Sequence, residues 1–249
     1  MEVVIRCDRS MLGDFAALHR DRASWKRDHG GIILADPRVR GTVLEIGAAA
    51  GTTSQPFDRI YALASVMDGV DPDPAIHHHA RLRNRWQGLL EEIPDVPEGA
   101  YDAAIALLVV EHVATPRAFL ERVFRALRPG GVFYATTVSS RHPFAWMVRA
   151  VQGLGLKGRF ARQSAHKVNE YPAHYRMNSP RTVAPIAEAV GFSRAEFFYH
   201  PCVQWDAYFP RWARWAPHLY DRAVGIRFPG AAQVLMYRLE KPESGAVSG

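Results

Sequence analysis

Short apolar runs alternate with stretches of helical length along the chain, and this alternation constrains the fold more than any other feature. The clearest runs are "TVLEIG" (42–47), "MDGVD" (67–71), "YDAAIALLVV" (101–110), "VFYATTV" (132–138), "AEFFYH" (195–200) and "AAQVLMYRLEK" (231–241), with a weaker one near 85–88. Between them, "TPRAFLERVFRALRPGG" (115–131) has its apolar residues on one helical stripe, after a capping Thr115 and before Pro129. Strand–helix alternation predicts an α/β fold with a mostly parallel sheet covered on both faces.

A small-residue turn follows the first of these runs. In Gly47–Gly51, alanine stands at position 49, where nucleotide-binding turns often have glycine, and position 49 thereby loses the freedom for positive φ. Asp71 ends the next run, 20 residues after Gly51, where a carboxylate can accept hydrogen bonds from both ribose hydroxyls of an adenosine. The turn and the acid together predict a nucleoside site.

Composition and charge narrow the class of protein. The chain has 249 residues with 48% hydrophobic content, no apolar run near the ~20 residues of a membrane span, and two cysteines. Two cysteines are too few for a disulfide framework, and the charged start of the chain lacks an apolar h-region. Together they predict a reduced, cytoplasmic protein without a secretory signal. The net charge is +6, and residues 141–181 alone carry eight Lys or Arg against Glu170. This excess is either a solvated face or an attraction for an anionic partner.

Four motifs, in order, resemble the class I S-adenosylmethionine-dependent methyltransferases. They are "VLEIGAAAG" (43–51), "GVDPDP" (69–74), "QGLLEEIP" (87–94) and "YDAAIALLVVEHVATPRAFLERVFRALRPGGVFYATT" (101–137). The likeness is closest to the small-molecule group with the "LEHV…PGG" signature. It implies a Rossmann-like, doubly wound, seven-stranded sheet with an antiparallel last strand, and S-adenosylmethionine as cofactor. Ala49 favours this cofactor over NAD, because no pyrophosphate has to lie on the turn.

The resemblance assigns the cofactor contacts residue by residue. The expected contacts are Glu45, Gly47, Ala48, Gly51, Asp71, Pro72, Leu89, Leu90, Ala106, Leu107 and His112. Glu45 would orient the loop and reach the methionine amino group through water, and Asp71 would bind the ribose. Leu89 and Leu90 stand where many members have an Asp for the adenine amino group, so apolar contacts would hold the adenine here.

The acceptor side is less constrained. His142 is the preferred general base, with His112 as a second catalytic candidate, because a hydroxyl nucleophile usually needs a base with a pKa near the working pH. Arg141, His142, Tyr171, Tyr175 and Arg176 are the expected substrate contacts, with the arginines suiting an anionic acceptor. His77, His78 and His79 point apart on a helix, so no metal site is expected.

Three functions remain open. The favoured one is methyl transfer to a small molecule, to oxygen rather than nitrogen or carbon, in natural-product or saccharide biosynthesis. The alternatives are a nucleic-acid (RNA) methyltransferase and a non-catalytic binding protein on the same fold. The absence of an Asn-Pro-Pro-aromatic tetrapeptide after the fourth strand argues against nucleic acid.

The expected organisation is one catalytic domain with insertions. Residues 1–40 form an N-terminal helical segment of the cap, residues 41–241 form the methyltransferase domain, and residues 242–249 form a flexible tail. Residues 141–181 and 201–230 are the cap and acceptor insertions. The aromatic and basic residues of the second insertion leave room for weak interfacial membrane association, and the oligomeric state is a monomer or a homodimer.

Overall fold

The computed structural model describes residues 1–7, 24–51, 57–154, 171–200, 209–220, 223–224, 228 and 231–244. The strands are β1 (Glu2–Cys7), β2 (Thr42–Ile46), β3 (Val66–Asp71), β4 (Arg85–Gln87), β5 (Tyr101–Leu107), β6 (Leu127–Val138), β7 (Arg194–His200) and β8 (Val234–Glu240). The helices are α2 (Ser24–Ala35), α3 (Phe57–Leu63), α4 (Pro116–Ala126), α5 (Pro143–Gly153), α7 (Pro180–Val190) and α8 (Trp215–Tyr220). Short 3-10 turns are η2 (Pro37–Arg40), η3 (Pro74–His78), η4 (Leu90–Glu92), η5 (Val110–His112) and η7 (Arg211–Ala213).

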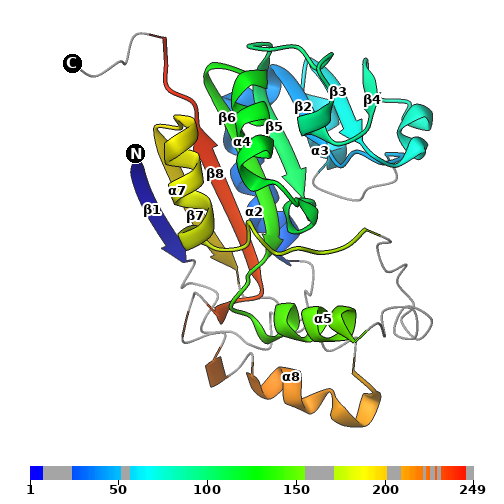
Figure 1. Ribbon diagram of the computed structural model, residues 1–249, viewed down its shortest axis with the longest axis vertical. Coiled ribbons are helices and arrows are strands. Elements are labelled where there is room, and N and C mark those ends of the chain that lie inside the picture. Colours follow the sequence, from blue (N-terminus) through cyan, green and yellow to red (C-terminus); the bar gives the residue numbers. More distant parts are fainter. Residues whose placement is uncertain are drawn as a thin grey trace.

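All described strands belong to one sheet in the order β1-β7-β8-β6-β5-β2-β3-β4 (Figure 1). β8 runs antiparallel to β6 and β7, and every other neighbouring pair is parallel. The predicted Rossmann-like sheet with an antiparallel last strand is therefore confirmed. The predicted strand number was wrong by one, because β1 adds an eighth strand beside β7.

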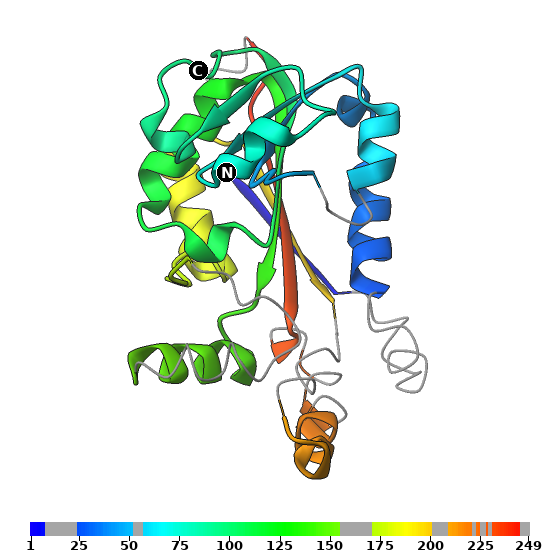
Figure 2. The same cartoon turned by 90° about the vertical axis from the view of Figure 1, so that its right-hand side faces the viewer.

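Helices cover both faces of this sheet. Figure 2 shows α4 and α7 on one face and α2 and α3 on the other. Phe119, Leu120 and Val123 of α4 are fully or almost fully buried, as the apolar stripe predicts. Thr115 occupies the N-cap position without a capping bond, because its hydroxyl donates to Glu91 Oε1 at 2.9 Å.

The N-terminus differs from the expected helical segment. Residues 2–7 form the edge strand β1, and the amide of Glu2 donates to the carbonyl of Ser193 at 3.0 Å. The run Val3–Ile5 is β-branched, which favours an extended strand over a helix. Of the remainder of 1–40, α2 is helical as expected and packs against the sheet, while residues 8–23 lie outside the described residues.

The carboxyl ends of the parallel strands meet at one edge of the sheet. In Figure 1, α5 and α8, which belong to the segments 141–181 and 201–230 expected to form a cap, lie beyond this edge. Residues 155–170 and 201–208 of the two insertions are outside the described residues. Within the described parts of the chain, no helix combines the length and apolar character needed to cross a bilayer.

Candidate functional site

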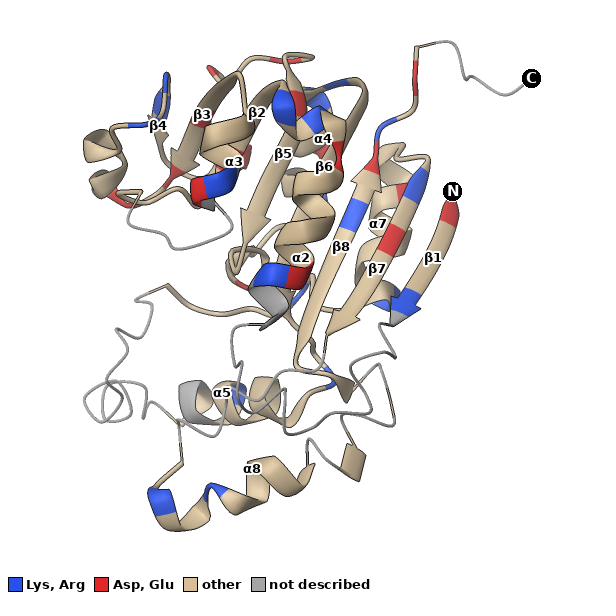
Figure 3. Cartoon of the chain, turned by 180° about the vertical axis from the view of Figure 1, so that it is seen from behind, with Lys and Arg blue, Asp and Glu red and all other residues tan. Residues whose placement is uncertain are grey.

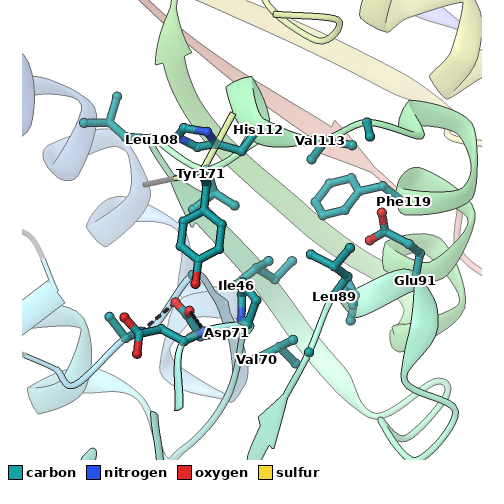
Figure 4. Close-up of a pocket in the computed structure, with 18 of the residues that line it drawn as sticks. Ile46, Val70, Asp71, Leu89, Glu91, Leu108, His112, Val113, Phe119 and Tyr171 are labelled. Atoms are coloured by element: carbon teal, nitrogen blue, oxygen red, sulfur yellow. Dashed lines mark hydrogen bonds between the residues drawn. The ribbon is translucent and has the colours of Figure 1, made fainter. Parts of the chain in front are cut away.

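A cavity of about 470 Å³ opens at the carboxyl ends of β2, β3 and β5. Its lining comes from the turn after β2, the end of β3, the segment Gly88–Glu91, the residues after β5, and Tyr171, Pro172 and His174 (Figure 4). Small-molecule sites have volumes of ~300–1,000 Å³, so the cavity can hold a nucleoside-sized ligand. It lies where open α/β sheets bind ligands, at the point where the strand order reverses.

The turn after β2 forms one wall, and its backbone is unusual. Gly47 has φ +83°, Gly51 has φ +70°, and Ala49 adopts a left-handed conformation with φ +45° despite its side chain. The amide of Ala49 donates to Asp71 Oδ2 at 2.8 Å, which fixes this conformation. Gly47 and Ala49 line the cavity, whereas Ala48 is buried behind it and Gly51 packs on His79.

Asp71 joins this turn to the end of β3. Its side chain is almost buried and also accepts from the amide of Asp73 at 2.7 Å. Burial raises the pKa of Asp71 above its usual value, while the two backbone hydrogen bonds partly oppose that rise. A carboxylate has about four lone-pair sites, so Asp71 can still accept hydroxyl hydrogen bonds from a ligand. Pro72 lines the cavity beside it.

Glu45 lies behind the turn in a buried polar cluster and does not line the cavity. The hydroxyl of Tyr61 donates to Glu45 Oε2 and lies 2.7 Å from His79 Nε2. Burial raises the pKa of Glu45 to about 8, and Glu45 Oε1 has no hydrogen-bond partner among the described residues. Tyr61 and His79 were not predicted as site residues, since no short sequence motif connects them to Glu45.

The histidine run is divided among different contacts. His77 bonds to Gln87 at 3.0 Å, and His79 packs under Gly51, where a Cβ would clash with its ring. No cluster of metal-ligating side chains occurs among the described residues.

A second wall follows β4. Leu89 and Leu90 line the cavity, with Leu90 buried and Leu89 partly exposed. Glu91 also lines the cavity. An acidic residue therefore stands one residue after Leu89 and Leu90, the position at which many members of the family have an aspartate. Glu91 was not predicted as a site residue, because the resemblance places Leu89 and Leu90, and not Glu91, at the adenine position.

The third wall follows β5. Leu107 and His112 line the cavity, while Ala106 is buried within the strand. Nδ1 of His112 lies 3.0 Å from the carbonyl of Pro172, and its ring is 6.5 Å from the ring of Tyr171. Figure 4 shows the Tyr171 ring between His112 and Asp71.

The structure does not bring His142 to this cavity. Its ring is fully buried, Nδ1 accepts from the amide of Phe144 at 3.1 Å, and Tyr220 packs edge-on at 5.4 Å. His142 therefore caps the first turn of α5. The histidine at the cavity besides His112 is His174, whose amide donates to the carbonyl of Glu111 at 2.7 Å.

Three other expected substrate residues also lie away from the cavity lining. Arg141 is exposed, and Arg176 is exposed with Nη1 donating to the carbonyl of Ala114 at 2.6 Å. Tyr175 is buried under Arg149, whose guanidinium lies 5.2 Å from its ring centre. Of the five predicted substrate contacts, only Tyr171 lines the described cavity.

The buried residue Glu111 supports the segment that carries Tyr171 and His174, through both its backbone carbonyl and its side chain. The Glu111 carbonyl accepts from His174 and Tyr175, and Glu111 Oε2 accepts from Thr137 at 2.9 Å. Asn178 donates to the same Thr137 hydroxyl at 2.6 Å. Burial raises the pKa of Glu111 to about 7.

Comparison with known proteins identifies the family. The family described as "Methyltransferase domain" matches residues 19–196, which is well over half of the chain. The chain belongs to this family. The methyltransferase is an enzyme with S-adenosylmethionine as its cofactor, as the resemblance implied.

Individual relatives agree with this assignment. The methyltransferase is 31% identical to a ubiquinone biosynthesis O-methyltransferase of Methylobacterium sp. over 45% of this chain and 47% of the relative. It is 32% identical to the protein of the same name from Paramagnetospirillum magneticum over 56% of this chain and 60% of the relative. The chain thus spans about half the length of the curated relatives it matches.

Solved structures share the fold at low sequence identity. One is a SAM-dependent methyltransferase from Archaeoglobus fulgidus, with a TM-score of 0.56 and 15% identity. The match covers 92% of this chain and 100% of that chain.

Proposed function

We propose that this methyltransferase transfers the methyl group of S-adenosylmethionine to a hydroxyl of a small-molecule acceptor. The observation that carries the proposal is the cavity, in which Asp71 and His112 lie on opposite sides of the Tyr171 ring (Figure 4), while Asp73, Glu91 and His174 also belong to its lining. The O-methyltransferase names of the relatives support oxygen as the nucleophile.

The carboxylate end suits the cofactor. Asp71, Asp73 and Glu91 line the cavity, and the described lining contains no lysine or arginine. S-adenosylmethionine carries a sulfonium and an ammonium group, so an acidic lining complements its charge. We assign the ribose hydroxyls to Asp71, the adenine to Pro72, Leu89, Leu90 and Glu91, and the methionine end to the turn at Gly47. Glu45, Ala48 and Gly51 act from behind the turn, by fixing its conformation.

The histidine end suits proton removal. The Pro172 carbonyl can only accept, so Nδ1 of His112 carries the hydrogen in the neutral ring and Nε2 carries the basic lone pair. The bound cofactor supplies an activated methyl group on a positively charged sulfur. With an acceptor bound, Nε2 of His112 would take the proton of the acceptor hydroxyl as its oxygen becomes methylated. Tyr171 and the surrounding apolar residues exclude water and hold the acceptor in line.

A pair of matched variants tests this role. His112→Asn keeps a donor near the Nδ1 position and removes Nε2, so kcat should fall roughly 10²–10⁴-fold with little change in KM. The assay uses labelled S-adenosylmethionine with catechols, phenolic acids and hydroxylated sugars, beside an amine panel. His174→Asn is the control from the same wall. A product methylated on nitrogen or carbon, or an unchanged kcat in His112→Asn, would overturn the proposal.

The hypothesis of an anionic acceptor is not supported by the two arginines that were expected to bind it. Arg141 and Arg176 do not line the cavity, and the basic residues 157–167 lie outside the described residues. We therefore place a neutral hydroxylated acceptor ahead of an anionic one. The same acidic lining gives no support to a nucleic-acid substrate.

A row of exposed apolar side chains supports weak association of the protein with a membrane surface. Trp212, Trp215 and Leu219 are 81%, 65% and 57% exposed and are spaced three and four residues apart. That spacing puts them on one side of the helical stretch η7–α8, beside Arg211 and Arg214. Co-sedimentation with phosphatidylglycerol vesicles should fall in Trp212→Ala/Trp215→Ala, and unchanged sedimentation would contradict the association.

A further inference from the structure

β1 forms one edge of the sheet. Its one neighbouring strand among the described residues is β7, in parallel register from Glu2 opposite Arg194 to Cys7 opposite Tyr199. Figure 3 shows β1 at the outer border, acidic near its start and basic near its end. The strand begins with the sequence Glu2-Val3-Val4-Ile5-Arg6.

The backbone orientation of β1 follows from one hydrogen bond. The amide of Glu2 points to β7, because it donates to the carbonyl of Ser193 at 3.0 Å. Backbone groups of successive strand residues point to alternate sides, so those of Val4 and Arg6 also face β7. The N–H and C=O groups of Val3 and Ile5 therefore point outward, away from the sheet.

The side chains at this edge are also incompletely covered. Val3 is 46% exposed and Ile5 is 59% exposed, and both are β-branched. Natural edge strands are usually protected by lysine, proline, a bulge or a covering element, because an exposed edge pairs readily with another strand. The central residues Val3–Ile5 of β1 contain neither a charge nor a proline.

The strand is complementary to itself about Val4. In an antiparallel pair around a two-fold axis at Val4, Val3 lies opposite Ile5 of the second copy, and Glu2 lies opposite Arg6 of the second copy. The outward groups of Val3 and Ile5 would then exchange about four backbone hydrogen bonds between copies. Glu2 and Arg6 fall at non-hydrogen-bonded positions, where opposite side chains approach most closely and opposite charges stabilise the pair.

We propose that two copies of this chain associate through antiparallel β1–β1 pairing, which joins their sheets into one continuous sheet. The occupant of the edge is thus a second copy, selected by the charge order of Glu2 and Arg6 and by the match of Val3 with Ile5. The pairing lies at the border opposite β4, away from the cavity, so it does not depend on the function proposed above.

The first test removes only the outward hydrogen bonds. Ile5→Pro deletes an amide that points away from β7, a position at which an edge strand tolerates proline. Analytical ultracentrifugation of the full chain should give twice the 27.9 kDa monomer mass for wild type and the monomer mass for Ile5→Pro, with the same circular dichroism spectrum and methyl transfer. Leu63→Lys, on the exposed side of α3, is the control and should remain dimeric.

The second test exchanges charges. Glu2→Arg and Arg6→Glu each place like charges opposite each other in a homodimer, so each variant alone should be monomeric. Mixing the two variants restores opposite charges at both ends of the pair and should give a heterodimer. The mixture is the decisive sample, because each variant alone also removes an ion pair within one chain: Arg6–Glu196 at 3.1 Å in Arg6→Glu, and Glu2–Arg194 at 3.5 Å in Glu2→Arg. A monomeric wild type, a dimeric Ile5→Pro, or a mixture that stays monomeric would each overturn the proposal.

Discussion

At the scale of single residues, Ala49 shows how the cofactor turn is held. An alanine with φ +45° is strained by roughly 1–2 kcal/mol, and the hydrogen bond from its amide to Asp71 is what maintains it. The same bond couples the turn to the acid that we assign to the ribose. One hydrogen bond therefore both maintains the strained backbone of Ala49 and orients the carboxylate of Asp71.

Replacing this alanine tests the strain directly. Ala49→Gly should raise the free energy of unfolding by roughly 0.5–1 kcal/mol, because glycine adopts positive φ without a side-chain clash. Urea unfolding measures the change. Ala48→Gly is the matched control: position 48 is buried without positive φ, and losing its methyl group should destabilise the protein. A destabilised Ala49→Gly would contradict the strain.

The charge of Asp71 should determine cofactor affinity. Asp71→Asn keeps the size of the side chain but replaces one acceptor oxygen with a donor. Calorimetry should show binding of S-adenosylmethionine weakened by roughly 1–3 kcal/mol. Asp58→Asn, at an exposed ion pair with Arg81, should bind normally. Equal affinities of wild type and Asp71→Asn would remove Asp71 from the site.

At the scale of elements, helix α5 begins where its sequence provides a cap. Pro143 favours the first helical turn, and Nδ1 of His142 accepts from the amide of Phe144. The buried imidazole also packs on Tyr220, so one side chain connects the start of α5 to α8. From this position we expect a structural role for His142.

His142→Ala separates these roles. Loss of the cap and the ring contact should lower the free energy of unfolding by roughly 1–3 kcal/mol. The methyl-transfer kcat at a temperature where the variant is folded should stay within about threefold of wild type. A fall of 10²-fold or more in kcat without loss of stability would restore His142 as the base.

The elements that the sequence predicted best are those with a local signal. The apolar runs of β2, β3 and β5 and the apolar stripe of α4 each depend on neighbouring residues, and the structure confirms these elements. Residues that meet through tertiary packing were missed, such as Tyr61 and His79 with Glu45. His142 does not line the described cavity, and a loop position after a strand does not reveal whether its ring turns toward a cavity or onto a neighbouring helix. β1 was missed although its β-branched run favours a strand; only its pairing with β7, nearly 200 residues away, has no local signal.

At the scale of the whole molecule, buried ionisable groups on different elements together determine how the free energy of unfolding depends on pH. The pKa of Glu45 is raised from 4.5 to about 8 and that of Glu111 from 4.5 to about 7, both chiefly by burial. The folded state therefore binds more protons than the unfolded state above pH 4.5, so stability falls as pH rises through this range. Burial holds the pKa of His29 at about 3, which destabilises the fold only below its ordinary value of 6.5. Between pH 6.5 and 8.5, the two glutamates should dominate.

The free energy of unfolding should accordingly fall by roughly 1–3 kcal/mol when pH is raised from 6.5 to 8.5. Glu45→Gln cannot ionise and keeps an oxygen that can accept from Tyr61, so its slope over this window should be shallower than that of wild type. Glu45→Gln/Glu111→Gln should be nearly flat. Urea unfolding at closely spaced pH values measures these slopes, with Glu121→Gln in the exposed Arg117–Glu121 pair of α4 as the control. If the wild-type protein is as stable at pH 8.5 as at pH 6.5, these carboxyls are not protonated in the fold, and the burial that raises their pKa must be relieved by water reaching the space behind the cofactor turn.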